Sequence, residues 1–153
     1  MQLTLYSDYS LRVLFYLSNM QKKTATITEI ATFYGISRNH LVKVVHRLAQ
    51  MNFIISLRGK GGGIKLAKDP GEIKIGDVIR KTEPNYTLVE CFNEKTNQCV
   101  ITNVCRLKRI LNEGLEAFLN VLDQYTIADS HTKGLARQIK FSIMSQRSTH
   151  ESS

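Results

Sequence analysis

The sequence is short of several residue types, and each shortage excludes a class of protein. Its 153 residues include no tryptophan, two prolines and three cysteines. So little proline excludes collagen-like and proline-rich chains, and an odd number of cysteines argues against a secreted disulfide framework. No apolar run approaches the roughly 20 residues that cross a bilayer, and no basic segment precedes the longest N-terminal one, at 13–17. We therefore expect a cytoplasmic protein with no membrane segment.

Acidic residues are scarce in one half of the chain. The net charge of +8 arises within residues 1–81, which hold 13 basic and 5 acidic side chains, because residues 82–153 hold 8 of each. Between Ser37 and Lys68 there are seven basic residues and no acidic one. This asymmetry indicates a polyanionic partner, most simply nucleic acid, although a solvated basic face would have the same composition.

Residues 26–51 have the pattern of a helix-turn-helix. A capping box at Thr26–Glu29 opens a short helix, which Gly35 ends. Ser37 is a suitable N-cap for the next helix, predicted over Arg38–Met51, where an apolar stripe faces a polar and basic side. Two helices joined by a tight glycine turn are typical of DNA-binding proteins, although other helical hairpins share the pattern.

Two more helices complete the predicted N-terminal domain. Apolar residues recur at helical spacing over Asp8–Asn19, where Ser7 or Asp8 can cap the first turn. Another short helix, over Ile75–Lys81, would return apolar side chains to the same core. Pro84 breaks the chain soon afterwards, so the domain is predicted to span residues 1–81.

A basic hairpin is predicted after the third helix. The runs 53–57 and 64–67 indicate two strands. The turn Arg58-Gly59-Lys60-Gly61-Gly62-Gly63 joins them, and it is so rich in glycine that its backbone can approach phosphates closely. A hairpin of this kind after a recognition helix is a wing. The alternatives are an ordinary exposed hairpin and a nucleotide-phosphate loop, the latter disfavoured because no Gly-Lys-Ser/Thr opens a helix here.

The second half of the chain carries one long amphipathic helix, predicted from Val104 to about Tyr125. Its apolar stripe consists of Leu107, Leu111, Leu115, Phe118 and Leu122. Residues 106–130 are predicted to form a dimerisation element, and the alternative is that the helix folds back on its own domain. Residues 131–153 are predicted to be a flexible tail. The expected fold is mainly α with a small β-wing: a winged helix-turn-helix domain plus a long dimerisation helix.

The cysteines cluster in the loop predicted over residues 82–105. They are Cys91, Cys99 and Cys105, in the spacing Cys-x7-Cys-x5-Cys. A zinc site would normally use Cys-x2-Cys pairs and four nitrogen or sulfur ligands, and no histidine lies in this loop. Three thiolates on a polar loop suit an iron–sulfur cluster better, with an oxygen donor as fourth ligand. The candidate donors are Glu90, Glu94 and Asp8. Reduced cysteines packed under a loop, or thiols that form a redox-switched disulfide, are the alternatives.

Several segments together resemble one known family. They are 6–12, Ile36–Val44, Arg58–Leu66, Ile75–Arg80, the three cysteines and Leu122–Asp129. Over about residues 1–130 the sequence is similar to the winged-helix repressor family that contains the iron–sulfur regulator IscR. The Ser-Arg-Asn-His run at 37–40 and the absence of a histidine near the third cysteine favour the nitric-oxide-sensing branch of that family.

The resemblance implies a homodimeric repressor that carries an iron–sulfur cluster, with [4Fe-4S] favoured and [2Fe-2S] possible. Cys91, Cys99 and Cys105 would ligate the cluster, and Asp8 of the other subunit would supply the oxygen ligand. Nitric oxide would displace ligands, so that the two winged domains lose their mutual geometry and affinity for a palindromic operator falls. Genes for nitric-oxide stress would then be derepressed.

The residues expected to meet double-stranded DNA fall in two groups. The recognition helix would offer Ser37, Arg38, Asn39, His40 and Lys43 to base edges or nearby phosphates. The wing would offer Arg58, Lys60, Gly61, Gly62 and Lys65 to the backbone or the minor groove. A thiol-redox or zinc-dependent switch on the same fold, and an adaptor or metal-trafficking module that binds no DNA, are the competing functions. No nucleophile–base pair or carboxylate pair points to an enzyme.

Overall fold

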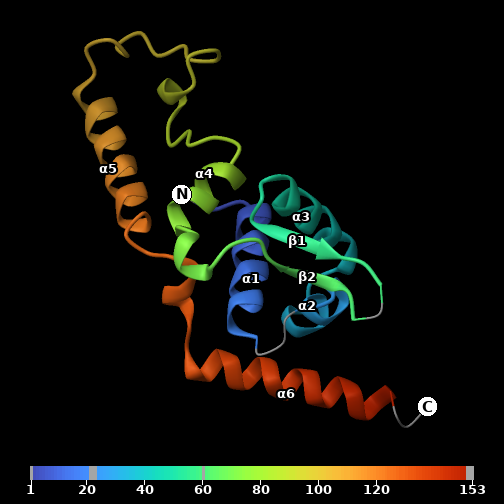
Figure 1. The fold of residues 1–153 in the computed structure, drawn as a ribbon. Helices are drawn as coiled ribbons and strands as arrows, with labels where there is room; N and C mark the ends of the chain where they lie inside the picture. The colour runs from blue at the N-terminus through green and yellow to red at the C-terminus, as the bar shows by residue number, and fades with distance from the viewer. Residues whose placement is uncertain (1, 21–23, 60, 151–153) are drawn as a thin grey trace.

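The computed structural model describes residues 2–20, 24–59 and 61–150. Within these ranges the chain forms six α-helices and a two-stranded antiparallel sheet (Figure 1). The elements are α1 (Leu5–Asn19), α2 (Ile27–Tyr34), α3 (Arg38–Gln50), β1 (Ile54–Leu57), β2 (Gly63–Leu66), α4 (Ile75–Thr82), α5 (Arg106–Leu122) and α6 (Lys133–His150). The predicted fold class is confirmed, and none of the described helices is long and apolar enough to cross a membrane.

The first helix begins earlier than the sequence predicts. Thr4 is its N-cap, because the backbone N–H of Ser7 donates to the Thr4 hydroxyl at 3.2 Å. The prediction that Ser7 or Asp8 caps the helix is therefore wrong, and Asp8 lies in the first turn instead. An acidic side chain is favourable there because the helix dipole is positive at this end.

The helix-turn-helix forms as its capping signals predict. Thr26 and Glu29 make both hydrogen bonds of a capping box at the start of α2. Gly35 ends the helix with a φ of 63°, and its N–H reaches back to the last carbonyls. A left-handed C-cap of this kind turns the chain sharply, so α3 can begin only three residues later.

One hydrophobic core holds the winged domain together. Leu14 and Tyr16 of α1, Ile30 of α2 and Leu48 of α3 are at most 1% exposed, and so is Ile54 of β1. α1 contacts α3, α4 and β2, so it is the central helix of the domain. Each large apolar side chain buried in this way contributes about 1.5–3 kcal/mol relative to an exposed one.

The wing is anchored to the segment before α2. β1 pairs with β2 in the register Ile54↔Leu66 to Leu57↔Gly63. Ala25 adds a bridge to Ile64, with two backbone hydrogen bonds of 3.0 and 2.7 Å. Because Ile64 pairs with Ser56 beside the turn, three backbone segments meet in the half of the hairpin nearest its tip.

Gly63 is essential to this junction. Its φ is 152°, and a Cβ placed there would lie 2.6 Å from the carbonyl oxygen of Ala25. Because the obstacle is backbone, it cannot turn aside, and we expect Gly63→Ala to lower the free energy of unfolding by about 1–3 kcal/mol. Gly134→Ala in α6 is the matched control, since a Cβ there meets nothing within 4 Å. We expect the control to leave stability unchanged or raise it slightly.

Thermal unfolding monitored by circular dichroism measures both substitutions. A Gly63→Ala variant as stable as the wild type would contradict the close contact between β2 and the segment before α2.

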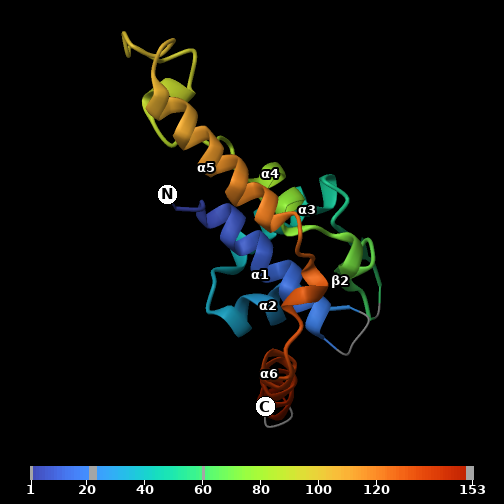
Figure 2. The same ribbon diagram turned by 90° about the vertical axis from the view of Figure 1, so that its left-hand side faces the viewer.

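The long helix α5 packs on the winged domain through its C-terminal half. Leu115 and Leu119 pack on Ile79 of α4. Arg80 forms a bidentate ion pair with Asp123, at 2.6 and 2.7 Å, and these hydrogen bonds lower the pKa of Asp123. Figure 2 shows the N-terminal half of α5 extending away from the body. The C-terminal half thus folds back on its own domain, and dimerisation through the N-terminal half stays a prediction.

Residues 133–150 form a helix where the sequence predicts a flexible tail over 131–153, and residues 151–153 lie outside the described part of the chain. Thr132 caps α6, since its hydroxyl accepts from the N–H of Leu135 at 3.1 Å. Its own N–H donates to the side chain of Asn19 at 3.4 Å. Ile139 is 1% exposed, in the core formed with α1 and α2. The weak apolar periodicity of this segment was sufficient for a helix because the winged domain supplies a surface on which the helix packs. The sequence alone does not show that surface.

Candidate nucleic-acid interface and cysteine loop

The first two turns of α3 present the predicted DNA-contacting side chains to solvent. Leu41, Val44 and Leu48 attach the helix to the core. The residues left exposed at this end are Ser37, Arg38, Asn39, His40 and Lys43. The structure therefore brings the whole predicted group to one surface, where side chains can reach base edges in a major groove.

Contacts across the turn orient the start of α3. Ser37 lies at the N-cap position, as predicted, but its side chain makes no capping hydrogen bond. The Nε of Arg38 donates to the hydroxyl of Thr28 in α2 at 3.3 Å. The two helices of the motif are thus linked directly at their exposed ends. Sequence reasoning missed Thr28, because no local signal pairs it with a residue ten positions later.

The wing residues are only partly accessible. Arg58 and Gly61 are exposed, whereas Gly62 and Lys65 are half-buried. The Gly61 carbonyl accepts from the hydroxyl of Thr24 at 3.2 Å, which fixes the tip against the segment before α2. Lys60 lies outside the described residues. The other members of the predicted wing group share one hairpin beside the recognition helix (Figure 1).

A cation–π contact joins the back of the recognition helix to α1. The guanidinium of Arg47 lies 5.3 Å from the ring centroid of Tyr6. Burial raises the pKa of Tyr6, whose hydroxyl is buried without a hydrogen-bond partner among the described residues. Tyr6 stands two residues before Asp8, so this contact connects the start of α1 to α3. Sequence reasoning assigned no role to either partner.

Asp8 is engaged by its own helix. Its two carboxylate oxygens accept from Arg12, at 3.0 Å from Nε and 2.8 Å from the terminal nitrogen. The hydrogen bond to Asp8 raises the pKa of Arg12. The carboxylate is nevertheless 38% exposed, and an ionised carboxylate has about four lone-pair sites. A metal could therefore bind one oxygen while Arg12 keeps the other.

The three cysteines lie at separate points of one projecting loop. Cys91 is in a short 3-10 turn, Cys99 is in the following coil, and Cys105 is the N-cap of α5. All three are free thiols and half-buried. Within the described ranges, no three metal-ligating side chains lie close enough together to hold a metal ion. One chain therefore does not gather Asp8 and the three cysteines into one site.

Asparagine side chains organise this loop, which sequence reasoning missed. Asn93 accepts from the N–H of Lys95 at 3.1 Å, and Asn97 accepts from that of Cys99 at 3.0 Å. These are Asx-turns, in which an asparagine holds the backbone two residues ahead. The sequence signal was an asparagine two residues before Lys95 and another two residues before Cys99. The two glutamates predicted as oxygen ligands are both exposed, and Glu90 also accepts a hydrogen bond from the N–H of Gln98 at 2.7 Å.

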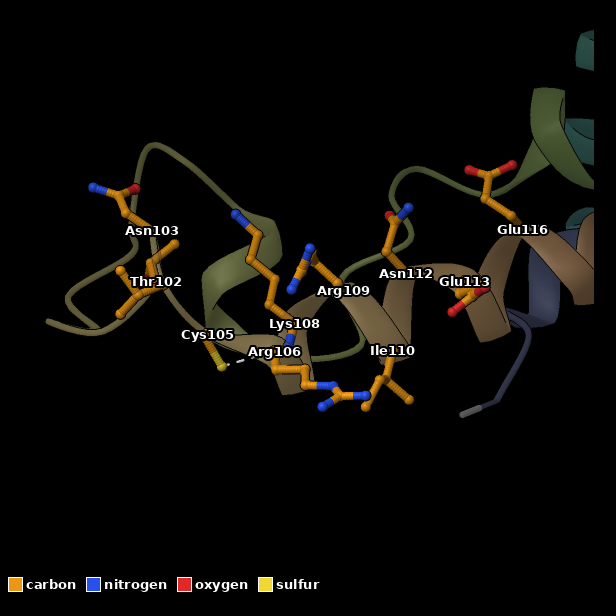
Figure 3. Close-up of a pocket in the computed structure, with 11 residues that line it drawn as sticks. Thr102, Asn103, Cys105, Arg106, Lys108, Arg109, Ile110, Asn112, Glu113 and Glu116 are labelled. Atoms are coloured by element: carbon orange, nitrogen blue, oxygen red, sulfur yellow. Dashed lines mark hydrogen bonds between the residues drawn. The ribbon is translucent and has the colours of Figure 1, made fainter.

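Cys105 borders an open hollow of about 1090 Å³ at the start of α5 (Figure 3). The N–H of Lys108 donates to its sulfur at 3.4 Å. The first turn of α5 carries Arg106, Lys108 and Arg109 and no acidic residue. Three cations at the positive end of a helix dipole are unfavourable unless an anion lies nearby, and a thiolate ligand is an anion.

These features test whether the residues suit an iron–sulfur cluster. Three free thiols and a partly exposed carboxylate have the donor chemistry that such a cluster requires. The cations around Cys105 suit a negatively charged group. The donors fit the group chemically, although a single chain does not gather them.

An apolar surface remains open on the projecting half of α5. Leu107 and Ile110 are 60% and 53% exposed, and Val104 just before the helix is 84% exposed. Leu115 and Leu119 of the other half are buried against α4, as described above. A monomer rarely exposes several large apolar side chains on one element. The exposed half is therefore suited to a partner.

Comparison with known proteins places the chain in a family. The model of the Rrf2 family, described as an iron-dependent transcriptional regulator, matches residues 3–132. A protein of Shouchella clausii named HTH-type transcriptional regulator NsrR is 52% identical over 130 residues, which cover 84% of this chain and 87% of that protein. A Bacillus subtilis protein of the same name is also 52% identical, over 84% of this chain and 89% of its own length.

Solved structures agree with this assignment. IscR of T. potens has 25% sequence identity and a TM-score of 0.65, with 84% of this chain and 85% of that chain covered. The oxidized form of Staphylococcus aureus CymR, at 24% identity and a TM-score of 0.66, covers 84% and 94% and shares the fold. The resemblance seen in the sequence is confirmed, and so is the prediction of a regulator rather than an enzyme. The chain belongs to the Rrf2 family of transcriptional regulators.

Proposed function

We propose that this regulator is a cytoplasmic repressor, which binds a palindromic operator as a homodimer and releases it when nitric oxide attacks a bound iron–sulfur cluster. The observation that carries the proposal is the projecting loop with its three free thiols, located at the far end of α5 from the chain's own DNA-binding surface. A cluster held by this loop would lie apart from the residues that contact the operator, and α5 would connect the loop to the winged domain.

Cys91, Cys99 and Cys105 would hold the cluster, and the partner subunit's Asp8 would complete the ligand set. Three thiols and one carboxylate favour a [4Fe-4S] cluster, with [2Fe-2S] as the alternative. When bound, the cluster supplies iron that reacts with nitric oxide, and an oxygen ligand leaves that iron more accessible than a thiolate would. Within this chain, the Lys108 N–H steadies the Cys105 sulfur and Asn97 holds the Cys99 turn.

The exposed half of α5 is the proposed dimer interface. Val104, Leu107 and Ile110 would pack against the same residues of a second chain, because a two-fold axis makes an interface self-complementary. Two winged domains related in this way can occupy half-sites about one DNA turn apart, roughly 34 Å. Affinity then depends on the spacing between the two α3 helices.

The contacts within the chain explain how the loop could control that spacing. The Arg80–Asp123 ion pair and the Ile79–Leu119 contact hold α5 to α4. The Tyr6–Arg47 contact joins the start of α1 to α3. A ligand set that spans two subunits would therefore fix one winged domain relative to the other. Loss of this ligand set would leave both winged domains folded but free to move apart.

Operator affinity before and after nitric oxide tests the proposal. We expect protein purified without oxygen to bind a palindromic operator duplex, and nitric oxide to weaken binding by at least about tenfold, or about 1.4 kcal/mol. Fluorescence anisotropy on the labelled duplex measures both states. Affinity that responds to peroxide or to zinc chelation but not to nitric oxide would contradict the proposal and favour the thiol or zinc switch.

A further inference from the structure

The C-terminal helix α6 lies outside the region that the family accounts for. The family model ends at residue 132, and α6 spans Lys133–His150. The helix packs on α1 and α2, with Ile139 buried in the core of the winged domain. α6 is therefore a part of the winged domain's surface that the family model does not cover.

The charges of α6 are all of one sign. Its 18 residues include Lys133, Arg137, Lys140 and Arg147 and no acidic side chain. The first three are exposed, and within the described part of the chain none of them forms an ion pair. The preceding segment has a net negative charge, because residues 82–132 hold four basic and seven acidic side chains. The chain thus becomes basic again only where it returns to the winged domain.

The spacing of the three exposed cations suits an extended polyanion. Lys133, Arg137 and Lys140 stand at i, i+4 and i+7, so they share one face of the helix, directed away from the buried Ile139. They extend over about 10 Å of the helix axis, at a rise of 1.5 Å per residue. A single small anion could not meet all three, whereas a row of phosphates could. Packing this helix on a domain of net charge +8 costs electrostatic repulsion, which a shared polyanion removes.

We infer that α6 is an additional DNA-binding element, which contacts the phosphate backbone of duplex DNA beside the half-site that α3 occupies. α6 contacts α2, and in a helix-turn-helix the first helix crosses the DNA backbone. Figure 1 shows α6 beneath α2, running toward the side of the molecule where the wing tip lies. The inference rests on the proposed operator binding, and it adds sequence-independent affinity for the DNA flanking the operator.

A triple variant tests the inference in the full-length protein. We expect Lys133→Gln, Arg137→Gln and Lys140→Gln together to weaken binding to a duplex that extends one turn beyond each half-site by roughly tenfold. The slope of log affinity against log salt should fall by about 0.9 for each phosphate that the variant no longer neutralises. Binding to a duplex trimmed to the two half-sites should be unchanged. The neutral substitution Gln138→Ala on α6 and Lys95→Gln on the cysteine loop are the controls, and both should match the wild type.

Each outcome of this experiment supports or overturns the inference. The charge-preserving variant Lys133→Arg, Arg137→Lys, Lys140→Arg should bind the extended duplex normally, which shows that a loss in the glutamine variant comes from charge rather than folding. Equal wild-type affinity for long and trimmed duplexes would overturn the inference while leaving the proposed function intact. Failure to bind either duplex specifically would instead refute the proposed function. Phe141 is 75% exposed beside the cations, so unchanged DNA binding with a loss of sedimentation with anionic lipid vesicles would assign α6 to a lipid surface.

Discussion

Cys99→Ser is expected to abolish the nitric-oxide response of operator binding and to leave the protein without stoichiometric iron. Serine keeps the size of the side chain but offers a hydroxyl where the proposed cluster requires a thiolate. The turn that holds residue 99 depends on backbone contacts to Asn97 and Thr102, so the substitution should not disturb the loop. Iron analysis of protein purified without oxygen measures the first effect, and anisotropy on the operator duplex measures the second.

Two further variants show whether the effect of Cys99→Ser comes from the loss of a thiol. Thr96→Ser, at an exposed position of the same loop, should retain iron and the nitric-oxide response. Asp8→Ala should bind iron but lose it faster under oxygen, because it removes one oxygen ligand and no thiolate. Circular dichroism should show all three variants folded. A Cys99→Ser protein with wild-type iron content and response would remove the cysteine loop from the sensing mechanism.

Arg38→Ala is expected to weaken operator binding by about 1–3 kcal/mol, roughly 5- to 150-fold, and to relax sequence preference at the base it contacts. Arg38 is exposed at the start of α3, and Thr28 holds its Nε at 3.3 Å without occupying the other donors of the guanidinium. Competition between operator duplexes with single base-pair changes measures the preference, and direct titration measures the affinity.

A residue at the other end of α3 provides the control for Arg38. Gln50→Ala lies at the exposed C-terminal end of α3 and should leave affinity unchanged. Arg58→Ala in the wing should weaken binding to all sequences alike and lower the salt slope by about one. If Arg38→Ala behaved like the wing variant, with no change in preference, α3 would not be the element that reads bases.

The sequence predicted the winged domain well because its signals are local. The capping box at Thr26–Glu29, the left-handed cap at Gly35 and the basic glycine turn each determine a short stretch of backbone without help from distant residues. The apolar periods of α3 and α4 then determined which faces are buried. Local signals failed at the start of α1, where Thr4 offered a better cap than Ser7 or Asp8.

The sequence could not predict features that depend on which surfaces meet. The apolar period of α6 was too weak to establish a helix until α1 and α2 provided a packing partner for Ile139. The split of α5 into a buried and an exposed half depends on where α4 ends, which its even stripe of leucines does not reveal. The cysteine spacing predicted three sulfur ligands, but the separation of these cysteines along a projecting loop required coordinates.

The most direct test of the account is the amount of iron and acid-labile sulfide per chain in protein purified without oxygen, with a visible spectrum before and after nitric oxide is added. We expect stoichiometric iron and sulfide and a sulfur-to-iron charge-transfer band that nitric oxide bleaches. A colourless protein that binds the operator with full affinity would contradict this mechanism and favour a thiol or zinc switch at Cys91, Cys99 and Cys105.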